Sequence, residues 1–327
     1  MVSPVQVLDN HQKRRLALYR QSFKIKAGDA DGHNCLGLIL MRQGMLNDAV
    51  MAFSWAISRQ PEFARAYHNL GKAYSTLDET GKALAAYRIA LRLEPDDPTA
   101  EHMVKALSGA EQQKPPRRFV RHLFDQYADT FEGHLAGGLK YQAPEYMRQA
   151  LVECRRDREL YENAVDLGCG TGLIGVVFAR LIRKFSGIDL SAKMLEKAKE
   201  KNVYDELEEG DICEALAARR ESFDLFLAGD VFNYLGELSE LFAIISDKAR
   251  PAAPVIFTTE TYDGRKYKLQ KNGRYAHNPY YIRKQAGKVA LKPIYNRNIR
   301  LRREKGTWLA GDVFVLVKEP LTSSTDC

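Results

Sequence analysis

The sequence lacks several features that would place it in a class at once. Its cysteines stand apart, with no C-x-x-C pair, which excludes the common zinc and redox motifs and favours a reducing compartment. No run approaches the roughly 18 apolar residues of a membrane-spanning helix, and residues 1–16 lack the apolar core of a secretion signal. We therefore expect a cytoplasmic protein without membrane association or a metal site. The cysteines are Cys35, Cys154, Cys169, Cys213 and Cys327.

The bulk composition is that of an ordinary globular chain. Its 327 residues are 45% hydrophobic and 28% charged, and a length of this order suggests two domains. The net charge is +7, with basic residues concentrated in residues 283–305. Such a stretch suits nucleic acid or an acidic carrier. Because residues 298–303 alternate like an edge strand with outward charges, we favour a solvated face and expect no nucleic-acid partner.

An internal repeat occupies the first third of the chain. Residues 30–63 and 64–97 align without a gap at a period of 34 residues. Small residues are expected where two antiparallel helices touch, an aromatic residue is expected to fill the gap to the next repeat, and a proline stops the second helix. The matched pairs are Gly37 and Gly71, Ala49 and Ala83, Phe53 and Tyr87, Ala56 and Ala90, and Pro61 and Pro95.

This pattern resembles the tetratricopeptide repeat (TPR), more closely in residues 64–97 than in residues 30–63. We expect residues 13–26 to be the second helix of a degenerate earlier unit and residues 98–109 to be a capping helix. An array of so few repeats buries little surface by itself. We therefore expect it to be stabilised by packing against the rest of the chain or against a second subunit.

The resemblance implies a groove that binds a protein partner or mediates self-association. Arg65, His68 and Lys72 would give that groove a basic lining. Ordinary solvated helix charges are the alternative. The Pro115-Pro116 pair, in the polar stretch 111–118, predicts a semi-rigid linker between a helical domain, residues 1–110, and a second domain, residues 119–320.

The part of the second domain that is expected to carry the chemistry begins with a strand, a glycine turn and a helix. Residues 163–167 predict the strand, residues 168–172 the turn, and residues 173–182 a helix closed by Arg183 and Lys184. Glycines permit positive φ and a close approach of the backbone to a ligand. This arrangement is typical of nucleotide-binding units.

The spacing of the glycines selects among nucleotides. They form G-x-G-x-G rather than the dinucleotide pattern G-x-G-x-x-G, and Asp166 stands two residues before Gly168. An acid there would repel a pyrophosphate but suits the ammonium and sulfonium groups of S-adenosylmethionine (SAM). Asp189 ends the next predicted strand, where an acid accepts ribose hydroxyls. Asp211 and Asp230 follow the ends of the third and fourth predicted strands.

Taken together, residues 119–318 resemble a class I SAM-dependent methyltransferase, and more narrowly the bacterial TPR-containing methyltransferases. The resemblance implies an α/β, Rossmann-like seven-stranded sheet closed by a hairpin of residues 298–303 and 312–317, behind an all-α TPR domain. It also implies that Asp211 meets the adenine amino group and that Tyr127 closes over the SAM carboxylate. The expected SAM-binding residues are Tyr127, Asp166, Gly168, Cys169, Gly170, Gly172, Asp189, Leu190, Met194, Asp211, Ile212 and Asp230.

The acceptor side is expected around residues 267–277 and the end of the fourth strand. Tyr234 would face the methyl group, and Arg274 would pair with a carboxylate or phosphate. His277 would act as a base or orient the acceptor, although a base is needed only for a poor nucleophile. A helix cap for His277 and a structural ion pair for Arg274 are the alternatives.

These features predict methyl transfer to a small-molecule or carrier-bound acceptor by O-methylation, with the repeats serving a partner or dimerisation. Two alternatives stay open. One is a protein methyltransferase whose repeats dock the target. The other is a scaffold that binds SAM without catalysis.

Overall fold

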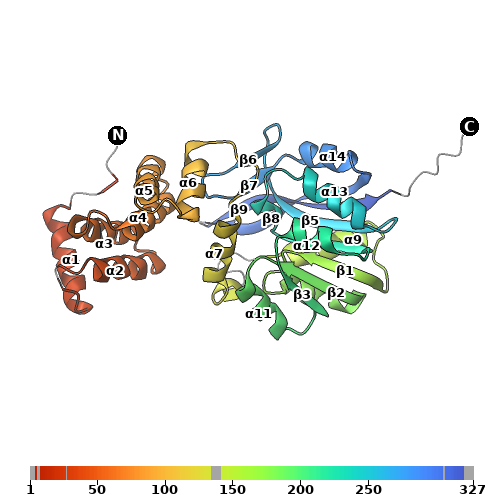
Figure 1. Ribbon diagram of the computed structural model, residues 1–327, viewed down its shortest axis with the longest axis horizontal. Helices are drawn as coiled ribbons and strands as arrows, with labels where there is room; N and C mark the ends of the chain where they lie inside the picture. Colours follow the sequence, from red (N-terminus) through yellow and green to blue (C-terminus); the bar gives the residue numbers. More distant parts are fainter. Residues whose placement is uncertain (1–3, 6–7, 27, 134–140, 305, 320–327) are drawn as a thin grey trace, which may run out of the picture. The chain divides into compact units, whose positions relative to one another are not determined.

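The computed structural model describes residues 4–5, 8–26, 28–133, 141–304 and 306–319. The chain forms two compact units, whose elements are labelled in Figure 1. The helical unit is Met1–Glu111 with Leu269–Gly273, and the mixed unit is Gln112–Lys268 with Arg274–Cys327. No helix in the described ranges is long and apolar enough to cross a membrane.

The helical unit is a row of antiparallel helix pairs. The pairs α2/α3 and α4/α5 are the two predicted repeats, and α6 follows them as the predicted last helix. The earlier helix α1 begins and ends a few residues before the predicted range 13–26. The bounds are α1 Asn10–Ser22, α2 Ala30–Arg42, α3 Leu46–Arg59, α4 Ala64–Thr76, α5 Thr80–Leu93 and α6 Pro98–Ser108.

The repeat glycines make room for an aromatic ring of their own repeat. A Cβ at Gly37 would lie 2.4 Å from the ring of Phe53, and one at Gly71 would lie 3.0 Å from the ring of Tyr87. The ring of the second helix lies directly on the glycine of the first, which lets the two helices of one repeat approach closely. The expectation that these rings also fill the gap to the next repeat stays a prediction.

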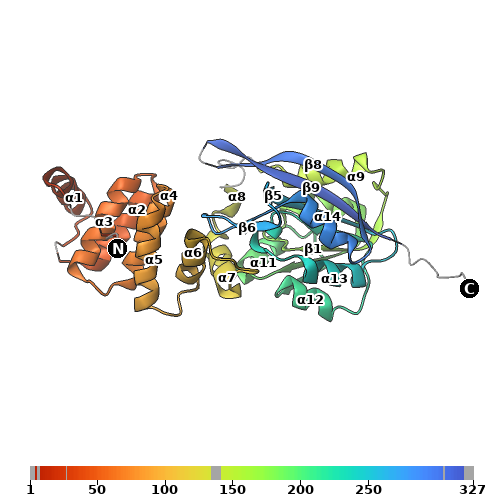
Figure 2. The ribbon, with the colours of Figure 1, turned by 90° about the horizontal axis from the view of Figure 1, so that it is seen from above.

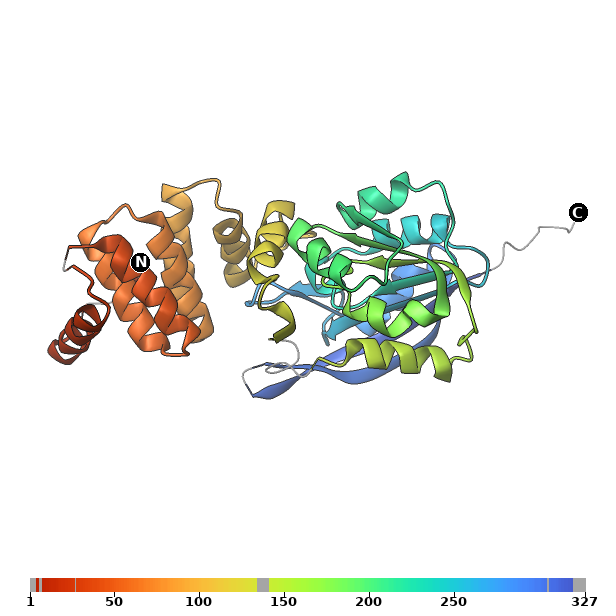
Figure 3. The same ribbon diagram turned by 90° about the horizontal axis from the view of Figure 1, so that it is seen from below.

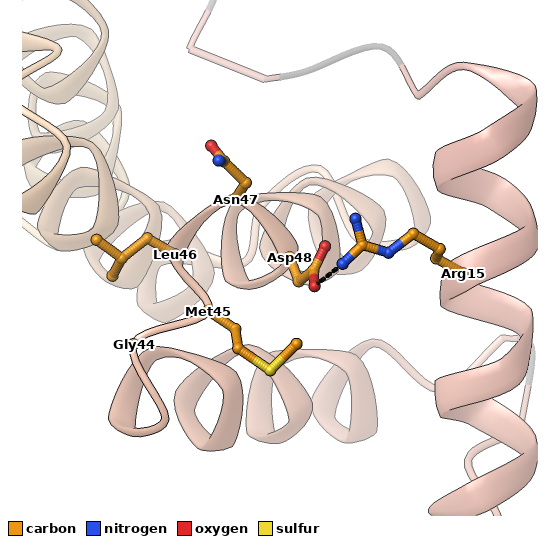
Figure 4. Close-up of a pocket in the computed structure, with 6 residues that line it drawn as sticks. All are labelled: Arg15, Gly44, Met45, Leu46, Asn47 and Asp48. Atoms are coloured by element: carbon orange, nitrogen blue, oxygen red, sulfur yellow. Dashed lines mark hydrogen bonds and ion pairs between the residues drawn. The ribbon is translucent and has the colours of Figure 1, made fainter.

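An ion pair joins α1 to the first repeat. Arg15 reaches across a surface pocket to Asp48 of α3, as Figure 4 shows. The Tyr19 hydroxyl donates to the same carboxylate at 3.0 Å. Asp48 is buried, so its pairing compensates for the lost hydration of the charge.

The basic residues predicted to line a groove on α4 differ in their surroundings. Arg65 and Lys72 are exposed. His68 is half-buried, and its Nδ1 lies 2.6 Å from an Asp97 carboxylate oxygen. The His68 imidazole is thus directed at an acid of its own unit.

The mixed unit is built on a sheet of the predicted kind. Its seven main strands have the order β3-β2-β1-β4-β5-β9-β8, with β1 to β5 parallel and β9 antiparallel to both neighbours. The last residues of β5 also pair with β7, which lies beside β6. The bounds are β1 Tyr161–Leu167, β2 Ile182–Asp189, β3 Glu206–Glu209, β4 Leu225–Ala228, β5 Pro254–Thr261, β6 Tyr267–Leu269, β7 Tyr275–His277, β8 Leu291–Glu304 and β9 Thr307–Lys318.

Helices cover both faces of this sheet (Figures 2 and 3). Residues of α9 and α10 fill one core, and residues of α12, α13 and α14 fill the core on the other face. Helix α9 also packs along the β8–β9 hairpin. The bounds are α7 Arg117–Tyr127, α8 Phe131–Gly133, α9 Ala143–Glu153, α10 Leu173–Phe178, α11 Ala192–Glu200, α12 Ile212–Ala218, α13 Ser239–Lys248 and α14 Pro279–Gly287.

The helix after the glycine turn is shorter than predicted. Helix α10 ends at Phe178, a 3₁₀ turn follows, and β2 begins at Ile182. Arg183 and Lys184 therefore lie in a strand and do not close a helix. The reason is tertiary, because residues from Ile182 onward pair with β1, starting opposite Tyr161.

The predicted linker is in part ordered by the mixed unit. Arg117 and Arg118 belong to α7, and the carbonyl of Gln113 accepts the backbone N–H groups of Gly236 and Glu237. The extended segment before α7 is thus held in place by two hydrogen bonds.

Candidate functional site

The glycine turn lies at the carboxyl end of β1, and its three glycines have φ values of 68°, 54° and 86°. A Cβ at Gly168 would lie 2.5 Å from Val231, so a side chain is excluded there by packing. A Cβ at Gly170 would meet nothing within 4 Å. The backbone at Gly170 therefore borders open space, which is what a ligand lying on the turn requires.

Asp189, at the carboxyl end of β2, is tied to this turn by backbone donors. The N–H of Gly170 donates to Oδ2 and the N–H of Ser191 to Oδ1, both at 2.9 Å. Burial raises the pKa of Asp189 to about 6, although both donors favour the ionised form. Each oxygen keeps a second lone pair, so the carboxylate is held rigidly and can still accept hydroxyls.

Asp166, at the end of β1, is fully buried beneath the turn. Its Oδ2 accepts a hydrogen bond of 2.7 Å from the hydroxyl of Tyr204. Its Oδ1 has no hydrogen-bond partner within the described ranges. Burial raises the pKa of Asp166 to about 7. An unpaired buried carboxyl oxygen of this kind is suited to receive a cation.

These features fit the predicted cofactor. Asp166 offers an acceptor for the ammonium group of SAM, Asp189 offers acceptors for ribose hydroxyls, and Gly170 leaves space for the nucleoside. Leu190 and Met194 follow Asp189 in the same turn and the first turn of α11, where Ser191 caps the helix. Cys169 is buried, and burial raises the pKa of its thiol well above the usual range, which disfavours a reactive thiolate. Its predicted contact with the cofactor stays a prediction.

Asp211 follows β3 as predicted, but its carboxylate already has partners. Oδ1 accepts the N–H groups of Cys213 and Glu214 and so caps α12, which begins at Ile212. Oδ2 pairs with Arg117 at 3.0 Å. The predicted contact between Asp211 and the adenine amino group stays a prediction.

Helix α7 borders the site on the β2 side. Ser191 donates its hydroxyl to Asp125 at 2.6 Å, and Arg121 donates to the carbonyl of Leu190 at 3.2 Å. Tyr127, the last residue of α7, is half-buried. Its predicted role over the SAM carboxylate also stays a prediction.

A cluster of charges occupies the carboxyl ends of β4 and β5. Arg302 pairs with Asp230 at 2.7 Å, with Glu304 at 2.8 Å, and with Glu260. Arg274 pairs with Glu260 at 2.8 Å and with Glu304. Arg302 is 3% exposed and Glu260 is fully buried. Each arginine therefore bridges carboxylates that would otherwise repel one another in a buried setting.

The expectation of a solvated basic face was wrong at Arg302. A β-bulge between Arg300 and Arg302 breaks the alternation of β8, so that Leu301 and Arg302 are both buried. A bulge of this kind re-aims a side chain. Arg300 and Arg303 are exposed, as expected.

The predicted acceptor-side residues lie in or near this cluster, and no observation tests their catalytic roles. Arg274 forms the ion pairs that were its structural alternative. Tyr234 packs against Phe124 of α7, with ring centroids 5.1 Å apart. His277 is fully buried, its Nε2 lies 3.1 Å from the carbonyl oxygen of Gly236, and burial lowers its pKa to about 4. His277 is thus neutral at physiological pH.

Sequence reasoning missed four residues of the site: Tyr204, Asp125, Glu260 and Arg302. Glu260 was within reach, because it lies one residue before the end of β5, much as Asp189 lies at the end of β2. Tyr204 lies in a connection between α11 and β3 that carries no motif, and Arg302 was concealed by apparent strand alternation.

Comparisons with known proteins identify two kinds of domain in this chain. Residues 165–257 match the model of a methyltransferase domain, and residues 64–97 match that of a tetratricopeptide repeat. The chain is 28% identical over 125 residues (37% of this chain, 22% of the relative) to the biotin biosynthesis bifunctional protein BioHC of Saccharophagus degradans. It is 27% identical over 114 residues (33% of this chain, 36% of the relative) to the mitochondrial ubiquinone biosynthesis O-methyltransferase of Saccharomyces cerevisiae.

A solved structure of similar fold is magnesium protoporphyrin IX methyltransferase from Synechocystis PCC 6803 with bound SAH. The TM-score is 0.49 at 17% identity, over 62% of this chain and 100% of that chain. The chain spans only 22% and 36% of the length of the two curated relatives named above.

Proposed function

From the premise that this chain carries a class I SAM-dependent methyltransferase domain with an N-terminal TPR region, we propose that it methylates a small-molecule or carrier-bound acceptor, at oxygen. The observation that carries the proposal is the pair of buried acids at adjacent strand ends. Asp166 presents an unpaired oxygen, and Asp189 is fixed by the glycine turn. Bound SAM supplies an activated methyl group on its sulfonium.

The protein's own residues bind and orient in this proposal. Asp166 and Asp189 would hold the cofactor's cation and ribose. The acceptor would bind on the side of Tyr234 and Arg274, which lie near the ends of β4 and β5. Holding donor and acceptor in line removes much of the barrier, since the sulfonium is already reactive.

Two observations favour an acceptor that needs no strong base. His277 is neutral, with a pKa of about 4, and Arg274 is engaged with two carboxylates. A carboxylate acceptor, or a phenol that loses its proton to solvent, fits this environment. The name of one relative, a ubiquinone biosynthesis O-methyltransferase, supports methylation at oxygen.

The second candidate is methylation of a protein that docks on the repeats. It is favoured by the exposed cations Arg65 and Lys72 on α4, which suit an acidic segment. In this alternative the TPR region selects the substrate, whereas in the main proposal it serves a partner or self-association.

The deciding experiment follows a labelled methyl group. The full chain is incubated with methyl-labelled SAM and a lysate, and the products are separated by size. We expect label in the small-molecule or carrier-protein fraction. Label confined to larger proteins would favour the second candidate, and SAM binding without labelled product would indicate a scaffold.

The test variant is Asp189→Ala, which removes the carboxylate tied to the glycine turn, and its matched control is Asp247→Ala. We expect at least a tenfold loss of SAM affinity by calorimetry and a parallel loss of label, because buried acceptors for the ribose are gone. Asp247→Ala removes an exposed acid on α13 and is expected to leave both unchanged. Unchanged SAM affinity in Asp189→Ala would contradict the assignment of the site.

A further inference from the structure

Tyr204 lies on the underside of the glycine turn. It belongs to the connection between α11 and β3, and its ring packs on Phe185 of β2 with centroids 4.7 Å apart. A Cβ at Gly175 would lie 2.5 Å from its hydroxyl, and one at Gly172 would lie 3.1 Å from its ring. The small residues at both positions therefore leave room for this tyrosine as well as for a ligand.

The hydroxyl of Tyr204 has one acidic partner. It donates to Oδ2 of Asp166 at 2.7 Å, while the backbone of Gly175 hydrogen-bonds the hydroxyl oxygen. Asp166 comes from β1 and is fully buried, so this hydrogen bond fixes the carboxyl plane from below. The other oxygen, Oδ1, is the one left without a partner in the described ranges.

We propose that Tyr204 is a positioning residue for SAM, which holds Asp166 so that its second oxygen meets the cofactor's ammonium group in ionised form. This inference rests on the proposed function. It assigns to Tyr204 the role of hydrogen-bond donor to Asp166 Oδ2, which neither the glycine turn nor the other strand-end acids fill.

The charges around Asp166 explain why such a donor is needed. The titratable groups that face it are Tyr204, Asp189, Cys169 and Tyr141. Burial and the nearby Asp189 both raise the pKa of Asp166, and the Tyr204 hydroxyl is the group that lowers it. With that hydroxyl the pKa of Asp166 is about 7, and without it the pKa would be higher, so a smaller fraction of the acid would be ionised at neutral pH. A protonated acid attracts an ammonium group weakly.

The test measures SAM binding to the full chain by calorimetry between pH 6 and pH 9. Tyr204→Phe keeps the ring and removes only the hydroxyl. If the pKa of Asp166 rises by about one unit, the variant binds SAM roughly fivefold more weakly than the wild type at pH 7, and the two become equal near pH 9. The ratio of the two affinities cancels the titration of the SAM amine itself.

Three further variants sharpen the result. Gly175→Ala places a methyl group against the hydroxyl and is expected to give the same pH-dependent loss, which serves as the test if Tyr204→Phe does not fold. Asp166→Asn is expected to abolish the pH dependence. Tyr295→Phe removes a hydroxyl that donates to Glu153, away from the site, and is expected to leave SAM affinity unchanged.

Two results would overturn the inference. One is an unchanged affinity of Tyr204→Phe at every pH. The other is a loss of the same size at pH 6 and pH 9, which a purely structural role would give. Failure of the wild type to bind SAM is a different outcome, because it would instead refute the proposed function.

Discussion

Arg302 holds a full positive charge at a position that is 3% exposed. Its three carboxylate partners raise its pKa well above the usual range despite its burial. In return, Arg274 and Arg302 keep the pKa of Glu304 below its usual value against the effect of burial. The cluster also binds Asp230, whose backbone adopts a φ of 57° that is uncommon outside glycine. Arg302 thus fixes the residue that follows β4.

Removing this charge leaves carboxylates unpaired. We predict that Arg302→Met lowers the free energy of unfolding by about 3 kcal/mol or more, because one partner of a buried ion network is lost. Urea unfolding of the full chain measures this. Arg300→Met, an exposed neighbour on the same strand, is the control and should change stability by less than about 0.5 kcal/mol. Equal effects of the two substitutions would contradict the buried role.

At the scale of elements, small residues set how closely neighbours pack. Gly37 lets the ring of Phe53 lie on α2, and Gly71 does the same for Tyr87 on α4. The bulge in β8 has the comparable effect of turning one side chain inward without ending the strand. Both devices depend on a partner element, since neither glycine nor an extra residue stabilises an isolated helix or strand.

The helix contact can be tested with a pair of glycines. Gly37→Ala gains roughly 1 kcal/mol of helix propensity but places a Cβ 2.4 Å from the Phe53 ring, and overpacking typically costs about 1–3 kcal/mol. We therefore expect net destabilisation in urea unfolding followed by far-UV circular dichroism. Gly81→Ala on α5 has open space around it and should be neutral or stabilising. Stabilisation by both changes would refute the close packing.

At the scale of the molecule, the two units have separate cores. Residues of α1 to α6 form one cluster, and the two faces of the sheet form two others with no residue in common with it. Residues 269–273 belong to the helical unit although they come from the second half of the chain. A cut of the sequence at residue 111 would therefore divide the helical unit.

Cofactor binding should stabilise the mixed unit more than the helical unit. At a SAH concentration about 100 times its dissociation constant, the unit that binds it gains about 2.7 kcal/mol. Hydrogen exchange of the full chain is expected to show this protection around residues 166–172 and 187–191, with much less in residues 30–108. Protection of the repeats as strong as that of the glycine turn would show that the two units unfold as one.

The sequence alone determined the features that depend on local spacing. The period of residues 30–97 identified the helix pairs, and the G-x-G-x-G turn with Asp166 and Asp189 predicted a SAM-dependent enzyme. Such patterns can be recognised in a sequence, because the backbone conformation at glycine and the period of a helix depend on neighbouring residues.

Only the tertiary structure decided which distant residues meet. It paired Tyr204 with Asp166, moved Arg183 and Lys184 from a predicted helix end into β2, and buried Arg302 among acids of β5, β8 and the segment after β4. Each of these depends on contacts between segments far apart in the chain, which strand alternation and residue type do not encode. The acids at the ends of β1 and β2 could therefore be predicted from sequence, whereas the charge cluster near the ends of β4, β5 and β8 required the fold.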